Sequence, residues 1–183
     1  MEKHQSVLKI ERSIDALKTA FRFNYAIMNE TIPVEPFRVA LTVGSVGGPQ
    51  IVEEPDIDYS NLIVDGQNIQ VFTLACCCIA IDEAFGSTLK QRNPASDMRE
   101  YVAWSIIYQL RNAFAHTPLT PKWDVKKTYK REYSLKLFSQ IISVDLTELD
   151  GQDFNLDQIG GVLSLFELIE YCKQTVSKLV ANQ

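Results

Sequence analysis

The sequence has few of the residues that metal and redox sites require. Among 183 residues there are only two histidines, His4 and His116, and four cysteines, three of which are adjacent. Zinc sites use spaced pairs of such ligands, so the run Cys76 to Cys78, with Cys172 far away, does not have the required pattern. We therefore expect buried core cysteines in a reducing compartment, and neither a metal nor another cofactor.

Long apolar runs and an excess of positive charge are also missing. The N-terminal stretch MEKHQSVLKIERSIDALKTAF has no uninterrupted apolar region, so no signal peptide is expected. The longest apolar run, FTLACCCIAI, is about ten residues long, which is too short to span a bilayer. The net charge of −5 argues against a uniformly basic surface but leaves room for a local basic patch. We expect a cytoplasmic protein with no membrane association.

What the sequence does contain is ordinary for a globular protein. Hydrophobic residues make up 46% and charged residues 22% of the chain. The length fits one domain over residues 1–183, with neither repeats nor low-complexity segments.

Four segments have apolar residues at helical spacing or are too long and apolar for strands. Their residue ranges are 5–28, 67–90, 96–116 and 156–181, and Gly86 is expected near the end of the second. Four helices predict a mainly α bundle.

Two segments interrupt this helical pattern. Residues 31–66 are rich in Gly, Pro and Asp, which predicts an irregular connection with at most a short strand or two. Residues 122–147 contain the β-forming runs REYSLKLF and IISVDLTEL, which predict a β-hairpin inserted between the last two helices.

The third predicted helix ends in an unusual group of polar residues. In IIYQLRNAFAHTPLTPKW, Arg111 and Asn112 precede His116 by five and four residues, and TPLTP stops the helix directly afterwards. Arg-x4-His with a polar residue after the arginine, at the end of a helix in a helical domain, resembles the motif of the HEPN family. Pro118 departs from one toxin subgroup, which has a tyrosine at that position.

The resemblance implies a function as well as a fold. HEPN domains are small helical bundles, and many are metal-independent ribonucleases of toxin–antitoxin or antiviral systems. They typically form homodimers in which two copies of the motif share a cleft. For this chain the resemblance implies RNA as substrate, an antitoxin as a possible partner, and Arg111, Asn112 and His116 as catalytic residues.

The chemistry of such a reaction suits these residue types. Histidine titrates near neutral pH and can transfer a proton, while arginine can donate two N–H groups to a phosphate. The asparagine amide can hold either group. On a regular helix Arg111 and His116 are about 140° apart. Either the helix loosens at its end, or the arginine of one subunit meets the histidine of another across a twofold axis.

Two carboxylates on the preceding helix could support the arginine. Asp82 and Glu83 lie in a mostly apolar segment, and buried carboxylates usually have partners. One of them could orient Arg111, or both could face solvent. In the purely structural alternative, Arg111 only forms an ion pair and His116 only caps the helix.

A basic segment follows the motif. Residues 122–136 carry a local charge of +4 and include Tyr129 and Tyr133. Cations bind phosphates and aromatic rings stack on unpaired bases, which suits single-stranded RNA. The alternative is the solvated face of a hairpin. The candidate RNA-binding residues are Lys122, Trp123, Lys126, Lys127, Lys130 and Arg131.

Two other functions stay open. The chain could be a non-catalytic HEPN-like module that binds RNA, a nucleotide or a protein. It could also be an ordinary helical protein in which the motif is accidental.

Overall fold

The structure, a computed structural model, describes residues 4–32, 41–45, 48–53, 62–115 and 117–182. Of the two segments between 41 and 53 it describes the backbone only.

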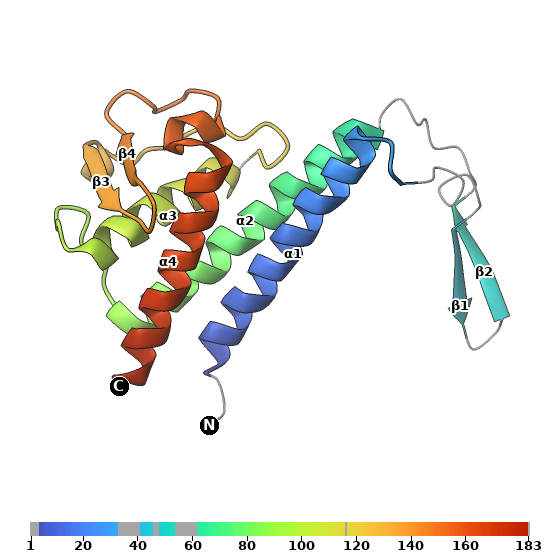
Figure 1. Ribbon diagram of the computed structural model, residues 1–183, viewed down its shortest axis with the longest axis horizontal. Helices are drawn as coiled ribbons and strands as arrows, with labels where there is room; N and C mark the ends of the chain where they lie inside the picture. The colour runs from blue at the N-terminus through green and yellow to red at the C-terminus, as the bar shows by residue number, and fades with distance from the viewer. Residues whose placement is uncertain (1–3, 33–40, 46–47, 54–61, 116, 183) are drawn as a thin grey trace. The chain divides into compact units, whose positions relative to one another are not determined.

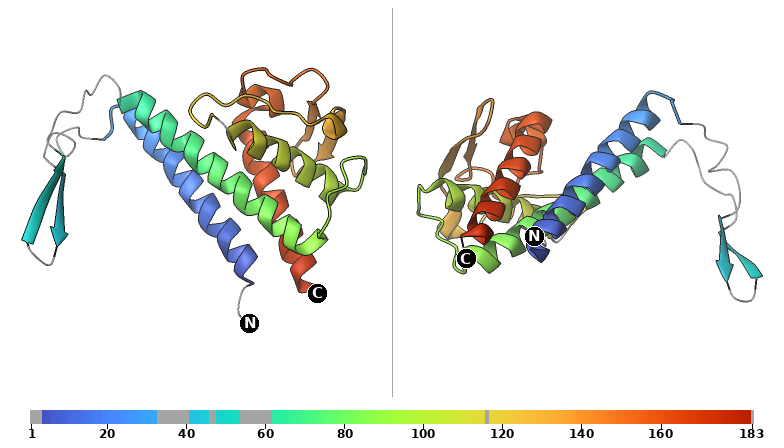
Figure 2. Two further views of the ribbon diagram at one scale, coloured as in Figure 1. Left: turned by 180° about the vertical axis from the view of Figure 1, so that it is seen from behind. Right: turned by 60° about the horizontal axis from the view of Figure 1, so that its bottom comes forward.

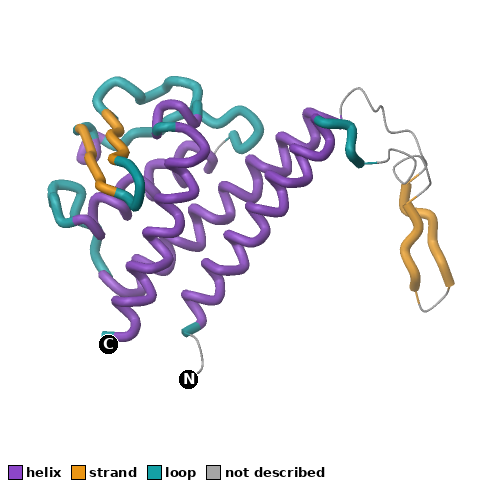
Figure 3. The backbone as a smooth tube through the Cα atoms, in the orientation of Figure 1, coloured by secondary structure: helices purple, strands orange, loops and turns teal. Residues whose placement is uncertain are grey.

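The protein is mainly helical, as predicted, with a two-stranded antiparallel hairpin between the last two α-helices (Figure 1). A second hairpin follows the first helix, so strands are confined to two short pairs within the described ranges (Figure 3). The elements are α1 (Gln5–Met28), β1 (Leu41–Ser45), β2 (Gly48–Glu53), α2 (Leu62–Leu89), α3 (Arg99–Ala115), η3 (Lys127–Tyr129), β3 (Glu132–Lys136), β4 (Ile141–Asp145), η4 (Leu156–Ile159) and α4 (Gly161–Ala181).

The chain forms two compact units. One comprises residues 1–18 and 71–183, and the other comprises residues 19–70. Both boundaries between the units fall inside helices, one in α1 and one in α2. The expectation of a single domain over 1–183 stays a prediction.

The core of the larger unit is built around α3. Nine consecutive residues, Val102 to Leu110, are buried, which requires neighbours on every side of the helix. The β3–β4 hairpin packs beside α3, as both views of Figure 2 show. Each of its strands alternates exposed and buried positions, which turns Tyr133, Leu135, Ile142 and Val144 toward the core.

The last predicted helix is divided in two. Gly160 and Gly161 both have positive φ, 84° and 83°, a conformation that glycine adopts without a steric penalty. Gly160 separates the short helix η4 from α4, which begins at Gly161. At the other end of η4, a capping box in which the side chains of Asn155 and Gln158 accept backbone N–H groups fixes where η4 begins.

The second predicted helix is longer than expected at its start. Helix α2 begins at Leu62, so the irregular connection predicted over 31–66 is too long at its C-terminal end. Gly86 does not end the helix. The helix continues to Leu89, and Lys90 follows with a φ of 63°. The short strands expected between 31 and 66 are confirmed as β1 and β2.

Helix α2 is also long and apolar enough to cross a membrane, and it is the one such helix in the described part of the chain. Its 18-residue window has a mean hydropathy of 1.6, and 39% of that window is buried inside the structure. This is weak evidence for a membrane span, since the core helix of a soluble protein meets the same criterion. The structure is compatible with a soluble protein.

Three of the four cysteines are buried, as expected, while Cys76 is exposed. Burial raises the pKa of Cys77 to about 11, and it also raises the pKa values of Cys78 and Cys172.

Candidate functional site

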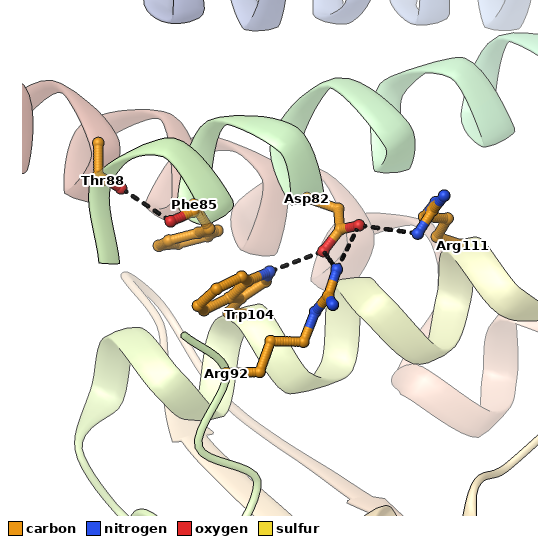
Figure 4. Close-up of polar contacts among 6 residues, drawn as sticks. All are labelled: Asp82, Phe85, Thr88, Arg92, Trp104 and Arg111. Atoms are coloured by element: carbon orange, nitrogen blue, oxygen red, sulfur yellow. Dashed lines mark hydrogen bonds and ion pairs between the residues drawn. The ribbon is translucent and has the colours of Figure 1, made fainter. Parts of the chain in front are cut away.

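A buried carboxylate lies at the centre of the polar contacts between α2 and α3. One oxygen of Asp82 accepts the indole N–H of Trp104 at 2.7 Å. Nη2 of Arg92 donates to both oxygens at 2.6 and 2.8 Å, and Nη1 of Arg111 donates to Oδ2 at 3.0 Å (Figure 4). Together with Tyr108, described below, these four residues are here called the Asp82 cluster.

The arginines differ from the carboxylate in their access to solvent. The Asp82 side chain is 4% exposed, whereas the side chains of Arg92 and Arg111 are 36% and 42% exposed. A buried carboxylate therefore binds two guanidinium groups, and part of each guanidinium-bearing side chain reaches the surface. Two cations on one anion leave a local charge of +1, which favours binding of an anion.

Helical spacing explains how α3 contributes to this cluster. Trp104, Tyr108 and Arg111 follow one another by four and three residues, so they share one face of the helix. Arg92 comes from the loop between α2 and α3. Its guanidinium lies 4.0 Å from the ring centre of Tyr108 and 5.2 Å from that of Trp104. Stacking on aromatic rings fixes the plane of the guanidinium.

Tyr108 connects the cluster to two further polar residues. Burial acts to raise its pKa, but hydrogen bonds with Lys126 and Asn112 and the charges of Lys126 and Arg92 outweigh it, so the pKa lies below its ordinary value. The Lys126 ammonium lies 5.7 Å from the centre of the Tyr108 ring. Asp124 opposes part of the charge of Lys126.

One donor of the cluster, Nε of Arg92, is buried and has no acceptor among the described residues. Buried donors usually find a partner, and an unsatisfied one is costly. The guanidinium that carries it stacks on the Tyr108 ring. An oxygen-rich anion bound beside this guanidinium could supply the missing acceptor.

The structure describes two of the three motif residues. Arg111 and Asn112 lie in the last turn and a half of α3, and both are partly exposed. His116 lies outside the described residues. How the histidine meets the arginine, within one chain or across a twofold axis, therefore stays a prediction.

The two candidate supporting carboxylates behave differently. Asp82 contacts Arg111 directly, as expected both if it orients the arginine for catalysis and if the two only form a structural ion pair. Glu83 is 60% exposed and lies 3.7 Å from Lys9 of α1, so it takes no part in the cluster.

Much of the charge of the basic segment is neutralised by aspartates. Lys122 pairs with Asp153 at 3.2 Å and Lys130 with Asp150 at 2.8 Å. Arg131 is bonded to Asp97. Lys126 and Lys127 are exposed, and Lys126 contacts the cluster through Tyr108.

The aromatic residues of the basic segment do not present faces for base stacking. Trp123 is only 2% exposed, and its indole N–H donates to Gln158. Tyr129 and Tyr133 are buried as well. The expectation that Trp123 binds RNA by stacking does not fit this burial. The ring instead packs against Phe154, which in turn contacts Phe114 of α3.

Sequence reasoning missed Arg92 and Tyr108. Arg92 lies in KQRNP, a loop without periodicity, and nothing local distinguishes it from a solvated arginine. Tyr108 did carry a signal, because it lies three residues before Arg111 on the same face of α3.

Comparison with known proteins adds no relative. The chain matches no family model, no curated protein and no solved structure. Within the described residues, no group of three His, Cys, Asp or Glu side chains could hold a metal ion. The resemblance to the HEPN family therefore rests on the Arg-x4-His motif and its helical context.

Proposed function

We propose that the protein is a metal-independent endoribonuclease of the HEPN type. The observation that carries the proposal is the Asp82 cluster, in which a buried carboxylate holds Arg111 of the motif beside a second guanidinium at the protein surface. A guanidinium with free N–H groups in a partly desolvated setting can bind a phosphodiester and stabilise the charge that develops on it during cleavage.

The remaining motif residues complete the reaction. His116 transfers the proton as the ribose 2′-hydroxyl attacks the adjacent phosphorus and the 5′-oxygen of the next nucleotide leaves. The products are a 2′,3′-cyclic phosphate and a free 5′-hydroxyl. Asn112 donates to the phosphate or positions the histidine through its side-chain amide.

The setting of the proposed enzyme combines what the resemblance implies with what the sequence predicts. We propose a cytoplasmic homodimer that acts on single-stranded RNA in a toxin–antitoxin or antiviral system. Lys126 and Lys127, whose side chains are exposed, would approach the RNA backbone.

The test is incubation of the purified protein with single-stranded RNA in EDTA. We expect cleavage with cyclic phosphate ends. A strand with 2′-deoxyribose at the cleaved positions should resist, since the attacking hydroxyl is gone. His116→Ala should lose at least about a hundredfold in rate, the usual contribution of a general acid or base.

Two results would contradict the enzyme. If the wild-type protein binds RNA without cleaving it, the non-catalytic module is the correct function. If cleavage proceeds equally on the deoxy-substituted strand, the proposed attack by the 2′-hydroxyl is wrong.

A further inference from the structure

The Asp82 cluster contains one more cation than its carboxylate needs. Arg111 alone would neutralise Asp82, yet Arg92 also donates to both of its oxygens, at 2.6 and 2.8 Å. Burying or half-burying an extra charge is unfavourable unless something compensates for it. Asp124 helps to raise the pKa of Lys126. Within the cluster itself, the guanidinium groups of Arg92 and Arg111 share the single carboxylate of Asp82, so the two arginines carry an excess positive charge.

The geometry places the two guanidinium groups side by side. The donating nitrogens of Arg92 and Arg111 lie within 3.0 Å of the same oxygen, Oδ2 of Asp82. They are thus close enough for the oxygens of one phosphate group to accept from both. Because the Tyr108 ring supports the Arg92 guanidinium at 4.0 Å, little side-chain freedom remains to be lost when a ligand binds.

An unsatisfied donor indicates what the ligand offers. Nε of Arg92 is buried without an acceptor in the described part of the protein. A phosphate supplies several acceptor oxygens and negative charge, which matches this donor and the excess cation.

We infer that Arg92 is a second phosphate-binding residue of this site, lying outside the Arg-x4-His motif, and that Asp82 positions Arg92 and Arg111 together on one phosphate of an RNA strand. This inference rests on the proposed function for the identity of the ligand. It assigns a direct ligand contact to a loop residue, where a purely structural arginine would only neutralise Asp82.

The test measures binding of a short single-stranded RNA by the full chain carrying His116→Ala, so that cleavage does not interfere. In this background Arg92→Ala should weaken binding about tenfold, the value of one charge-assisted hydrogen bond. Arg99→Ala is the matched control. Arg99 is also on the chain's surface and stacked on a tyrosine, Tyr171 at 5.0 Å, but it is not part of the cluster.

A second background separates direct contact from a structural role. Asp82→Asn removes the negative charge that a purely structural Arg92 would neutralise, and it keeps an acceptor for the Trp104 indole N–H. If Arg92 touches RNA, Arg92→Ala should weaken binding in the Asp82→Asn protein too, by several-fold or more. If Arg92 acts only through Asp82, that loss disappears.

The outcomes distinguish this inference from the proposed function. Two results overturn the role of Arg92. One is RNA binding by Arg92→Ala as tight as that by Arg99→Ala, and the other is a loss of binding that vanishes in the Asp82→Asn background. Either result leaves the proposed nuclease intact if the wild type still cleaves RNA in EDTA. If the His116→Ala protein does not bind RNA at all, the inference is also wrong, and the cleavage assay decides the enzyme separately. Thermal unfolding of each variant confirms that the comparison is between folded proteins.

Discussion

At the scale of single residues, the motif predicts two residues of the described site, Arg111 and Asn112, but not Arg92, which binds the same carboxylate. Arg111 and Asn112 could be selected from the sequence because residue type and spacing suffice to mark them. Arg92 could not, because its role depends on the loop between α2 and α3 returning to Asp82. The basic segment around Trp123 predicts that its ring stacks on RNA bases, whereas packing against Phe154 buries the ring.

The neighbouring acids Asp82 and Glu83 offer a paired test of whether Asp82 holds the cluster together. Asp82→Ala leaves the Trp104 indole N–H without its acceptor and two guanidinium groups without their anion. Because both arginines are more than a third exposed and can be solvated, we expect a loss of about 2 kcal/mol in the free energy of unfolding rather than the full cost of a buried pair.

Glu83→Ala is the control for this change. Its carboxylate is 60% exposed and 3.7 Å from Lys9, so the effect should stay within about 0.5 kcal/mol. Urea denaturation of both variants measures the difference. Equal losses would show that Asp82 does not organise the cluster.

At the scale of elements, periodicity predicted which segments are helices and both ends of α1, Gln5–Met28, but it missed the start of α2. The apolar residues of α2 and α3 decide their burial, so both could be identified from sequence. The start of α2 at Leu62 falls in a stretch whose Gly and Asp content indicates a turn, and packing against α1 overrides that local preference. The same holds for Gly86, which is helical.

The two glycines of α2 lead to opposite predictions. A Cβ at Gly66 would lie 2.8 Å from Oδ1 of Asn24 and 3.0 Å from Cδ1 of Ile27, and Asn24 is buried and bonded to Gln70. Gly66→Ala should therefore destabilise the protein by roughly 1–2 kcal/mol, because α1 must move away.

Gly86→Ala should do the reverse. The nearest atom to its Cβ would be a Trp104 ring carbon at 3.9 Å, an ordinary contact. Alanine then stabilises the helix by up to about 1 kcal/mol. Thermal unfolding of the two variants checks both signs, and a destabilised Gly86→Ala would contradict the packing described for α2 and α3.

At the scale of the whole molecule, the fold class could be predicted and the assembly could not. Four helices and an inserted hairpin follow from patterns along the chain, whereas a site shared between subunits depends on surfaces that no local pattern specifies. The pKa values of the buried thiols likewise depend on the folded protein as a whole, because burial sets them.

The buried thiols make stability fall at high pH. The pKa of Cys77 is about 11 in the folded protein against 9.0 when unperturbed, and those of Cys78 and Cys172 are also raised. As the pH rises, the unfolded chain releases its thiol protons before the folded protein does. The contribution of Cys77 to the free energy of unfolding is therefore fully present below pH 9 and is lost as the pH rises toward 11.

Cys77 alone should account for about 2 kcal/mol of this loss. The free energy of unfolding in urea, measured for wild type and Cys77→Ala from about pH 8 to about pH 11, isolates its share. A pH dependence identical in the two proteins would contradict the assignment.

Subunit mixing tests whether the proposed site is composite. Arg111→Ala and His116→Ala should each be inactive alone. If the arginine of one subunit serves the histidine of the other, a mixed dimer regains one intact site, and mixing the two variants after exchange of subunits should restore cleavage. Absence of activity in a mixture shown to contain mixed dimers would place the arginine and histidine of each site in one chain.

The most direct test of the central claim is the initial rate of RNA cleavage in EDTA by wild type, Arg111→Ala and Arg99→Ala. The account predicts that Arg111→Ala loses at least about a hundredfold, since a fixed cation no longer meets the developing phosphate charge, while Arg99→Ala keeps the wild-type rate. Cleavage by Arg111→Ala at the rate of the Arg99→Ala control would show that the guanidinium held by Asp82 is not part of a nuclease site.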